Sequence, residues 1–329
     1  MGTSTQATGA IATAITLLSC AALAQDPSAA YPSRPVTIII PSPPGATSDR
    51  DARIWAQKLT QAFGKPFVLD FKAGAGSTIG TNFVAKAAPD GYTLLNITSS
   101  FPVLAATYKD LPYDSIRDFA PVSLMLRRPT MLAVHPSLPV NTFPEYVAYA
   151  RAHPGELNFG TAGGGSISHI VGAWLQSATD TKVTFVHYKG AAPNQLDLMA
   201  GRTQVTTMSL SVGVPFIKAG KLRAIAILSP ERSALLPGMK TVAEQGTPDF
   251  NYSTLTAILA PAAVPAPIVN KLSAELARIT KAPDIIAAAA EDGTVLVGST
   301  PAAARQYLET EINRWRKLVR ENDIQAEEF

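Results

Sequence analysis

The sequence predicts an α/β protein with two lobes. Three observations lead to this prediction: the chain has 329 residues, short apolar segments alternate with segments of helical periodicity, and long helices dominate the final third. A chain of this length exceeds the roughly 100–200 residues of one ordinary domain. Alternating strands and helices indicate βαβ crossovers, which give mostly parallel sheets with helices on both faces.

The first lobe begins with short β-branched or aromatic strands, and turns rich in glycine, proline or serine separate them from helices. In chain order the expected elements are a strand at 36–40, a helix at 49–63, a strand at 67–71, a helix ending near 87 and a strand at 92–98.

The second lobe repeats the pattern, and helices then close the chain. The expected strands lie at 157–161, 183–188, 205–210 and 222–228, and the helices at 167–177, 193–200 and 215–219. Two long helices follow at 267–280 and 301–322, with a short strand at 295–297 between them. Thr300 is expected to cap the last helix and Pro301 to be its first residue.

Composition excludes several classes of function. The net charge is +3, and 16% of the residues are charged. A nucleic-acid-binding protein needs a concentrated basic footprint, which this balance does not provide. We therefore expect neither nucleic acid nor an anionic membrane surface as the main partner.

The first 24 residues predict an export signal. They contain no charged side chain, an apolar stretch spans 10–18, and Ala22-Leu23-Ala24 has the small-residue spacing of a cleavage site. The positive charge that usually precedes the apolar stretch is missing. The stretch is shorter than the roughly 20 residues of a membrane-spanning helix. We predict cleavage near Ala24.

The single cysteine offers an alternative for this segment. Cys20 follows Leu17-Leu18-Ser19, which resembles a lipoprotein box, in which Cys20 would be lipidated and retained. Cleavage after Ala24 instead leaves a chain with no disulfide and no cysteine-based site. Beyond the signal no apolar run approaches about 18 residues, so the mature chain is predicted to be soluble.

Three loops rich in glycine and hydroxyl side chains follow predicted strands and precede predicted helices. They span 45–49, 74–78 and 163–168. At the carboxyl ends of parallel strands, unpaired N–H groups at helix N-termini attract anions. Glycine allows close approach of the backbone, and Ser or Thr adds donors without charge. Together these loops suit a carboxylate, although any one alone is compatible with a tight turn.

Cofactor sites are not indicated. Gly74-Ala75-Gly76 with Gly80 resembles a dinucleotide fingerprint whose last glycine comes one residue late. The acidic residue that would hold the ribose is replaced by 96–98, an Asn-Ile-Thr segment. The four histidines lack metal-ligand spacing. We predict no cofactor and no metal.

One catalytic alternative remains open. His169 follows Ser166 by three residues and Ser168 by one, which suggests a serine hydrolase that uses Ser166 and His169. No G-x-S-x-G elbow accompanies them. Helix capping or ligand hydrogen bonding is the simpler interpretation of these side chains.

Eight short motifs in a fixed order cover the mature chain, and together they resemble the tripartite tricarboxylate transporter receptors, also called Bug receptors. The motifs are Tyr31-Pro32-Ser33-Arg34-Pro35, Pro43-Pro44-Gly45 with Asp49, Lys72-Ala73-Gly74-Ala75-Gly76, Pro89-Asp90-Gly91-Tyr92-Thr93, Leu111-Pro112-Tyr113-Asp114, Tyr188-Lys189-Gly190, Ala219-Gly220-Lys221-Leu222-Arg223 and Thr241-Val242-Ala243-Glu244-Gln245-Gly246.

The resemblance implies a periplasmic solute-binding protein of the type II-like, Venus flytrap kind. It implies capture of a di-, tri- or aromatic carboxylate, delivery to a two-component membrane permease, a monomeric chain and no catalysis. A receptor that signals to a membrane sensor shares this ligand chemistry and stays an alternative. The expected organisation is a signal peptide at 1–24, a first lobe at 31–130 plus 255–329, and a second lobe at 131–254.

Site residues follow from the family's two loops and from neighbouring strand ends. The first-lobe loop corresponds to 43–49 and the second-lobe loop to 163–168, beside His169. The predicted binding residues are Pro44, Gly45, Ala46, Thr47, Ser48, Asp49, Gly76, Ser77, Thr78, Ser99, Ser100, Phe101, Gly164, Gly165, Ser166, Ser168, His169, Met208 and Ser209.

Two departures from the family pattern and one aromatic side chain bear on this site. Ala46 replaces the usual second glycine of the first loop, and Asp70-Phe71 replaces the usual Glu-Asn before the Gly74 loop. Phe101 is predicted either to stack on an aromatic carboxylate or to pack beneath its own loop. The expected mechanism is a clamp in which the solute favours a closed form, because only that form satisfies it from both lobes.

Overall fold

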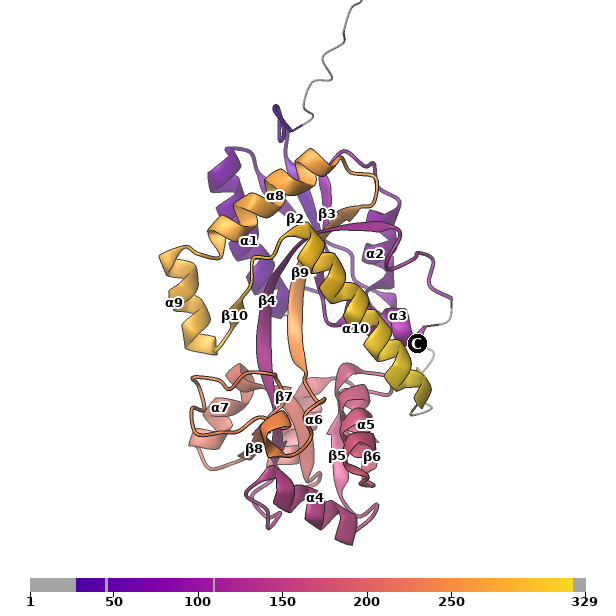
Figure 1. Cartoon of the computed structure of the whole chain (residues 1–329), viewed down its shortest axis with the longest axis vertical. Coiled ribbons are helices and arrows are strands. Elements are labelled where there is room, and N and C mark those ends of the chain that lie inside the picture. The colour runs from indigo at the N-terminus through magenta and orange to yellow at the C-terminus, as the bar shows by residue number, and fades with distance from the viewer. Residues whose placement is uncertain (1–27, 45–46, 109, 322–329) are drawn as a thin grey trace, which may run out of the picture.

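The computed structural model describes residues 28–44, 47–108 and 110–321 (Figure 1). In the first part of the chain, βα units succeed one another as the sequence predicts. The elements are β1 (Val36–Ile40), α1 (Thr47–Phe63), β2 (Phe67–Phe71), the 3-10 turn η1 (Ala75–Ser77), α2 (Thr78–Ala85), β3 (Thr93–Thr98) and α3 (Ser100–Thr107).

The middle of the chain begins with one long strand and continues with further βα units. These elements are β4 (Phe119–Val134), α4 (Phe143–Ala152), β5 (Asn158–Thr161), α5 (Ile167–Thr179), β6 (Thr184–His187), α6 (Ala191–Met199), β7 (Val205–Ser209), α7 (Leu210–Lys218) and β8 (Arg223–Ile227). The predicted strands match to within two residues. The predicted helix at 215–219 is longer and begins at Leu210.

The last part of the chain returns to the first lobe. It contains the 3-10 turn η2 (Ala243–Gln245), β9 (Ser253–Pro261), α8 (Ala266–Ile279), α9 (Pro283–Asp292), β10 (Val295–Leu296) and α10 (Pro301–Glu321). The predicted start of α10 is confirmed, because Pro301 is its first residue and the Ala303 N–H donates to Thr300 Oγ1 at 3.3 Å.

The sheet is mixed, whereas the sequence predicts mostly parallel strands. The order β2-β1-β3-β9-β4-β7-β5-β6 runs through the molecule, with β8 and β10 paired to β4. Within each lobe the βα units pair in parallel, as in β1–β3 and β5–β6. The antiparallel pairs all involve β4 or β9. The prediction missed β4 because Pro121 and Pro129 interrupt its apolar pattern.

β4 and β9 connect the two lobes, and Figure 1 shows them as the long ribbons between the upper and lower parts. β4 pairs with β9 up to Pro129 and with β7 from Thr130 onward. The predicted lobe boundaries, at 130/131 and 254/255, fall inside these two strands.

Apolar cores lie in both lobes, and tryptophans contribute to each. Trp55 belongs to the first-lobe core between the sheet and helices α1 and α8. Trp315 of α10 is fully buried against Trp174 of α5, at 6.1 Å between ring centroids. α10 therefore packs on the second lobe as well as the first. None of the helices in the described ranges is long and apolar enough to cross a membrane.

Candidate functional site

Because of the strand directions, the predicted loops of both lobes lie at the junction between the lobes. β3 and β4 each run antiparallel to β9, so β3 points the same way as β4, toward the second lobe. β7 runs antiparallel to β4 and therefore points toward the first lobe. Thr98 at the end of β3 is level with Leu126 of β4, through Thr256. Ser209 at the end of β7 pairs with Thr130. At about 3.3 Å per residue, the two strand ends are roughly 13 Å apart along β4.

The loop after β1 leads into α1. Gly45 and Ala46 lie outside the described residues, Thr47 and Ser48 form the start of the helix, and Pro44 is exposed. Asp49 is buried in the first helical turn, where its carboxylate complements the helix dipole. The Arg53 Nε lies 2.7 Å from Asp49 Oδ1, so this carboxylate already has a cationic partner beside the predicted ligand loop.

The loop after β2 is shaped by its backbone. Ala75, Gly76 and Ser77 have φ angles of 43°, 61° and 87°, a left-handed stretch that includes two residues other than glycine. Each such residue stores strain on the order of 1 kcal/mol or more, which the surroundings must stabilise. Thr78, at the start of α2, follows directly. These backbone angles therefore fix the directions of the N–H and C=O groups of the loop.

The loop after β3 holds two predicted residues that the structure buries, Ser99 and Phe101. Ser99 Oγ accepts the Leu255 N–H at 2.8 Å and ties β3 to β9, and the Ser100 hydroxyl accepts from Thr98 Oγ1 at 3.3 Å. The Phe101 ring is 4% exposed and packs edge-on against Phe119, at 5.5 Å between centroids. Of the two predictions for Phe101, packing beneath the loop describes this ring.

The second-lobe loop is held by side chains. Ser166 caps α5 by accepting the His169 N–H, and its Oγ lies 3.1 Å from Ser168 Oγ. Ser168 Oγ accepts the Ala162 N–H at 2.9 Å, and His169 Nδ1 accepts the Gly165 N–H at 3.0 Å. The side chains of Ser166, Ser168 and His169 thus hold the loop in place through hydrogen bonds to its own backbone. One of the two hydroxyl hydrogens is used in the bond between Ser166 and Ser168. The other hydroxyl hydrogen and the Nε2–H of His169 are the side-chain donors that these three residues have for an anion.

His169 is held neutral by its surroundings. Burial lowers the pKa of His169 to about 4, and His187, at 4.6 Å between ring centroids, adds to the shift. The bond from Gly165 N–H needs an unprotonated Nδ1, which agrees with this direction. His187 in turn bonds Thr161 Oγ1 at 2.7 Å. Sequence reasoning missed both His187 and Thr161, although both lie at the ends of strands beside the predicted loop.

Two further predicted residues, Met208 and Ser209, lie at the end of β7. Met208 is 6% exposed and belongs to the apolar cluster beneath α7. Ser209 is half-buried and precedes the first residue of α7, with its Oγ 3.4 Å from Ser211 Oγ. Ser209 therefore stands at the lobe junction, and Met208 points to the core.

The geometry does not form a Ser–His pair. Ser166 Oγ accepts the backbone N–H of His169 and lies 3.1 Å from Ser168 Oγ, while His169 Nδ1 accepts the Gly165 N–H. A hydrolase would need the Ser166 hydroxyl to donate to the imidazole. In the described part of the chain, no group of three or more His, Cys, Asp or Glu side chains is placed to hold a metal ion.

A buried ion pair missed by sequence reasoning fixes α1 to β4. Arg128 donates to both carboxylate oxygens of Asp51 at 2.7 Å, and both side chains are less than a tenth exposed. Arg128 precedes by one residue the point at which β4 changes partner, and Asp51 lies in the first turns of α1. The pair thus links the helix after the first predicted loop to the strand that enters the second lobe.

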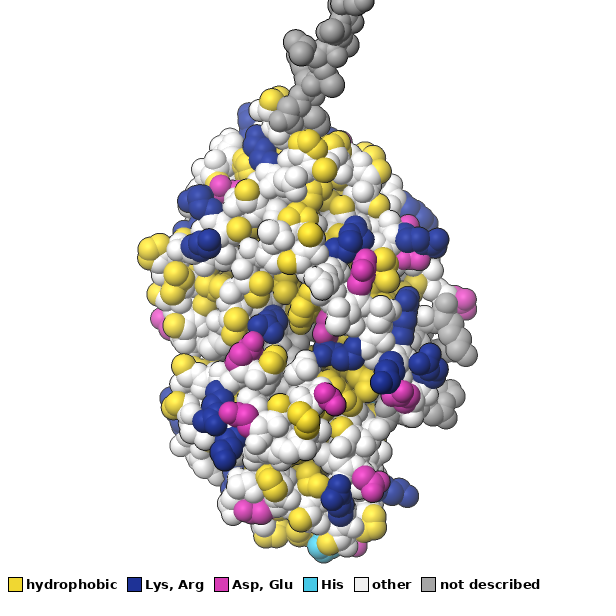
Figure 2. Space-filling view, viewed as in Figure 1, with side chains coloured by type: hydrophobic (Ala, Val, Ile, Leu, Met, Phe, Trp, Pro, Cys, Tyr) yellow, Lys and Arg dark blue, Asp and Glu magenta, His cyan; other side chains and the backbone are white. Residues whose placement is uncertain are grey.

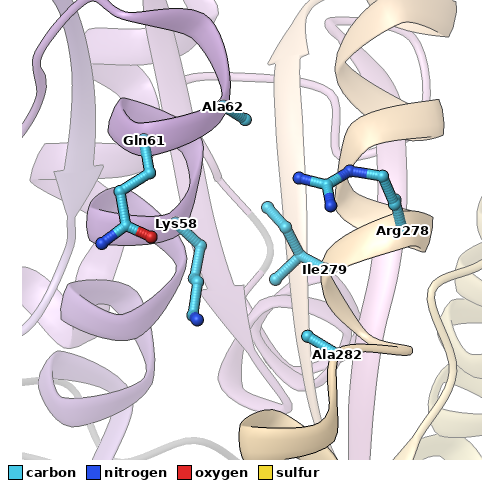
Figure 3. A pocket seen from close by; sticks show the side chains of 6 residues that line it. All are labelled: Lys58, Gln61, Ala62, Arg278, Ile279 and Ala282. Atoms are coloured by element: carbon cyan, nitrogen blue, oxygen red, sulfur yellow. The ribbon is translucent and has the colours of Figure 1, made fainter.

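A pocket between α1 and α8 lies away from these loops (Figure 3). Lys58 and Arg278 point into it, but Lys58 is paired with Asp284 and Arg278 with Glu275. Its cationic groups are therefore already neutralised. Figure 2 shows charges of both signs interspersed over the visible face, without a field of one sign.

Comparison with known proteins shows to which family the chain belongs. Residues 52–324 match the family described as "Tripartite tricarboxylate transporter family receptor". The chain belongs to this receptor family. It is 35% identical over 293 residues to protein BugT of Bordetella pertussis, covering 88% of this chain and 90% of BugT.

Two solved structures of the same fold contain carboxylates. Rpa4515 of R. palustris, with adipate, is 33% identical, has a TM-score of 0.76 and covers 90% of this chain and 99% of its own. MatC of Rhodopseudomonas palustris, with bound malate, is 29% identical, has a TM-score of 0.74 and covers 88% of this chain and 100% of its own. Members of this family are periplasmic solute-binding receptors with two lobes that bind small carboxylates and work with tripartite tricarboxylate transporters. The serine hydrolase alternative finds no support among them.

Proposed function

We propose that this receptor captures a small dicarboxylate or tricarboxylate between its lobes and delivers it to a two-component membrane permease of the tripartite tricarboxylate type. The observation that carries the proposal is that loops of both lobes end at the same junction, bearing neutral donors and helix N-termini. Adipate and malate in two relatives support a solute with two carboxylates.

Neutral donors are sufficient for such a solute. One helix N-terminus contributes about 0.3–1 kcal/mol, whereas each charge-assisted hydrogen bond contributes about 1.5–3 kcal/mol. Ser166, Ser168 and His169 on one side, with the backbone N–H groups of Ala75 and Gly76 on the other, supply several such bonds, while the Ser77 N–H donates to the Gly74 carbonyl. The first-lobe carboxylate Asp49 does not repel the solute strongly, because Arg53 neutralises it.

Closure by the clamp follows from the connection between the lobes. We propose that β4 bends near 129–130 and β9 near 253, where β4 exchanges β9 for β7 as its partner. The lobes are then 31–130 plus 255–329 and 131–254. A solute that bonds to both lobes shifts the population toward the closed form by its differential affinity for that form.

The aromatic carboxylates in the prediction receive less support than aliphatic ones. Phe101, the side chain expected to stack on an aromatic ring, is engaged with Tyr113 and Phe119 in the core. We further propose that the chain is exported with cleavage near Ala24, acts in the periplasm as a monomer and catalyses no reaction. Residues 1–24 lie outside the described ranges.

Thermal unfolding of the purified mature chain tests the proposal. The probes are adipate, malate, citrate, glutamate and phthalate, each at several concentrations. A solute that binds only the native state stabilises it by about 2.7 kcal/mol at about 100 times its Kd. We expect stabilisation by an aliphatic di- or tricarboxylate and an unchanged mass spectrum of the solute. Absence of any shift, or conversion of the solute to a product, contradicts the proposal.

A further inference from the structure

The outer face of the first lobe carries a cluster of exposed apolar side chains. Seven large apolar side chains are exposed in the described part of the chain, and two of them, Ile79 (54%) and Phe83 (48%), lie one helical turn apart on α2. Figure 1 places α2 on the opposite flank of this lobe from α9. Adjacent exposed apolar side chains rimmed by polar residues are typical of interaction surfaces.

These residues border a groove of about 650 Å³, which we call the α2 groove. It is lined by Lys72, Ile79, Asn82, Phe83, Lys86 and Ala87. The side chains project from one face of α2 and from the chain that leaves β2. β2 is the last strand in the sheet order and pairs with β1. In the described ranges, no other strand pairs with β2.

The charge of the α2 groove is positive on balance. Lys72 lies with its Nζ 4.4 Å from the centre of the Phe83 ring and 3.0 Å from the Asp70 carboxylate. Lys86 is exposed, and no described carboxylate forms an ion pair with it. An apolar groove with a cationic rim fits a segment that bears apolar side chains and a carboxylate.

The α2 groove lies directly beside the predicted ligand loop that follows β2. A side chain at Gly74 would meet Ile79 Cδ1 at 2.6 Å, so Ile79 lies directly against the loop after β2. A side chain at Gly80 would meet the Lys72 carbonyl at 2.7 Å and Pro41 at 2.9 Å. α2 is therefore packed tightly against the chain that follows both β1 and β2. A partner in the α2 groove touches the element that carries part of the candidate site.

We propose that the α2 groove docks an acidic, apolar periplasmic segment of the membrane permease. This proposal rests on the receptor function proposed above, because that function requires contact with a permease. The apolar side chains of the segment contact Ile79 and Phe83, and its carboxylate pairs with Lys86. A second copy of this chain is the competing occupant.

Site-specific photocrosslinking tests the contact directly. The receptor carries benzoylphenylalanine in place of Phe83 and is added to liposomes that contain the permease subunits of a tripartite tricarboxylate transporter from the same cell. The matched control carries the photoprobe in place of Leu196 on α6, which is 63% exposed. We expect a receptor–permease adduct from position 83 and at least tenfold less from position 196. Equal adducts, or a receptor–receptor adduct alone, overturn the proposal.

Transport and binding measurements distinguish this proposal from the proposed function. We expect Phe83→Asp and Lys86→Glu each to lower uptake into the liposomes at least tenfold, while the Kd for the transported carboxylate stays within twofold of wild type. The control Ile286→Asp changes an exposed side chain of α9 and should leave uptake unchanged. Wild-type uptake by the groove variants overturns the docking proposal alone. A wild-type receptor that crosslinks but binds no carboxylate overturns the proposed function alone.

Discussion

The loops on the two sides of the candidate site are held in place by different kinds of interaction. On the first lobe, the backbone at 75–77 is forced into left-handed angles, and Asp51 and Arg128 anchor the helix after the neighbouring loop. On the second lobe, Ser166 and His169 accept N–H groups of their own loop. The first side therefore depends on backbone geometry and on the buried Asp51–Arg128 pair. The second side depends on hydrogen bonds made by the side chains of Ser166 and His169. We expect changes on the first side to affect stability most and changes on the second side to affect affinity most.

The largest expected effect is on the anchor of the first side. Arg128→Met leaves the Asp51 carboxylate buried without its partner, which should lower the free energy of unfolding by about 3–5 kcal/mol. Urea denaturation measures this loss. The control Arg34→Met removes an exposed ion pair with Asp90 and should cost at most about 1 kcal/mol. An Arg128 variant as stable as this control would falsify the anchoring role.

The next effect separates affinity from stability on the second side. Ser166→Ala removes a helix cap worth about 1 kcal/mol and a solute donor worth about 1.5–3 kcal/mol. The Kd should therefore rise roughly 10- to 100-fold, measured by calorimetry. Thr142→Ala removes the cap of α4, far from the lobe junction, and should lower stability alone. If both variants bind equally well, the Ser166 hydroxyl does not contact the solute.

A smaller effect follows from the neutral imidazole of His169. Because the folded pKa of about 4 lies below the ordinary value of 6.5, the folded chain binds fewer protons there than the unfolded chain. The contribution of His169 to stability is complete above about pH 6.5 and is lost as the pH falls toward about 4. His169→Asn keeps an acceptor for Gly165 and should flatten the pH dependence of the urea midpoint in this window. An identical pH dependence in the variant contradicts the interpretation.

The smallest effect concerns strain in the first-side loop. Ser77 has φ 87°, an angle that glycine adopts without the penalty that a Cβ imposes. Relief of that strain opposes the entropy that glycine loses on folding, so Ser77→Gly should change the free energy of unfolding by less than about 1 kcal/mol, toward greater stability. Ser168→Gly, on the second side, should instead destabilise, because the Ala162 N–H loses its acceptor. A destabilised Ser77→Gly variant would show that the loop needs the Ser77 side chain.

Local elements and loops were predictable from the sequence, whereas contacts between distant segments were not. β1 and β2 match their predicted bounds because short β-branched or aromatic runs between turn residues carry a clear signal. β4 was missed because two prolines and two arginines interrupt it, and its burial depends on partners from both lobes. β9 was missed as well, so the antiparallel pairs that make the sheet mixed were not predicted.

The same distinction applies to the candidate site. Ser166 and Ser168 were predictable because capping acts within a few residues of the chain. The Asp51–Arg128 pair joins positions 77 residues apart, and no local pattern indicates it. His187 and Phe101 depend on tertiary packing, which placed the first beside His169 and the second in the core.

The central claim is that one carboxylate solute is held by loops of both lobes. Calorimetry with the solute identified by thermal unfolding tests it most directly, with one obstructing variant on each side: Ser100→Phe at the first-lobe strand end and Ser166→Phe at the second. Circular dichroism checks that both variants fold, and Ser166→Thr serves as the conservative control. We predict at least a tenfold rise in Kd for both obstructing variants and little change for Ser166→Thr. Wild-type affinity in either folded obstructing variant would contradict a site shared between the lobes.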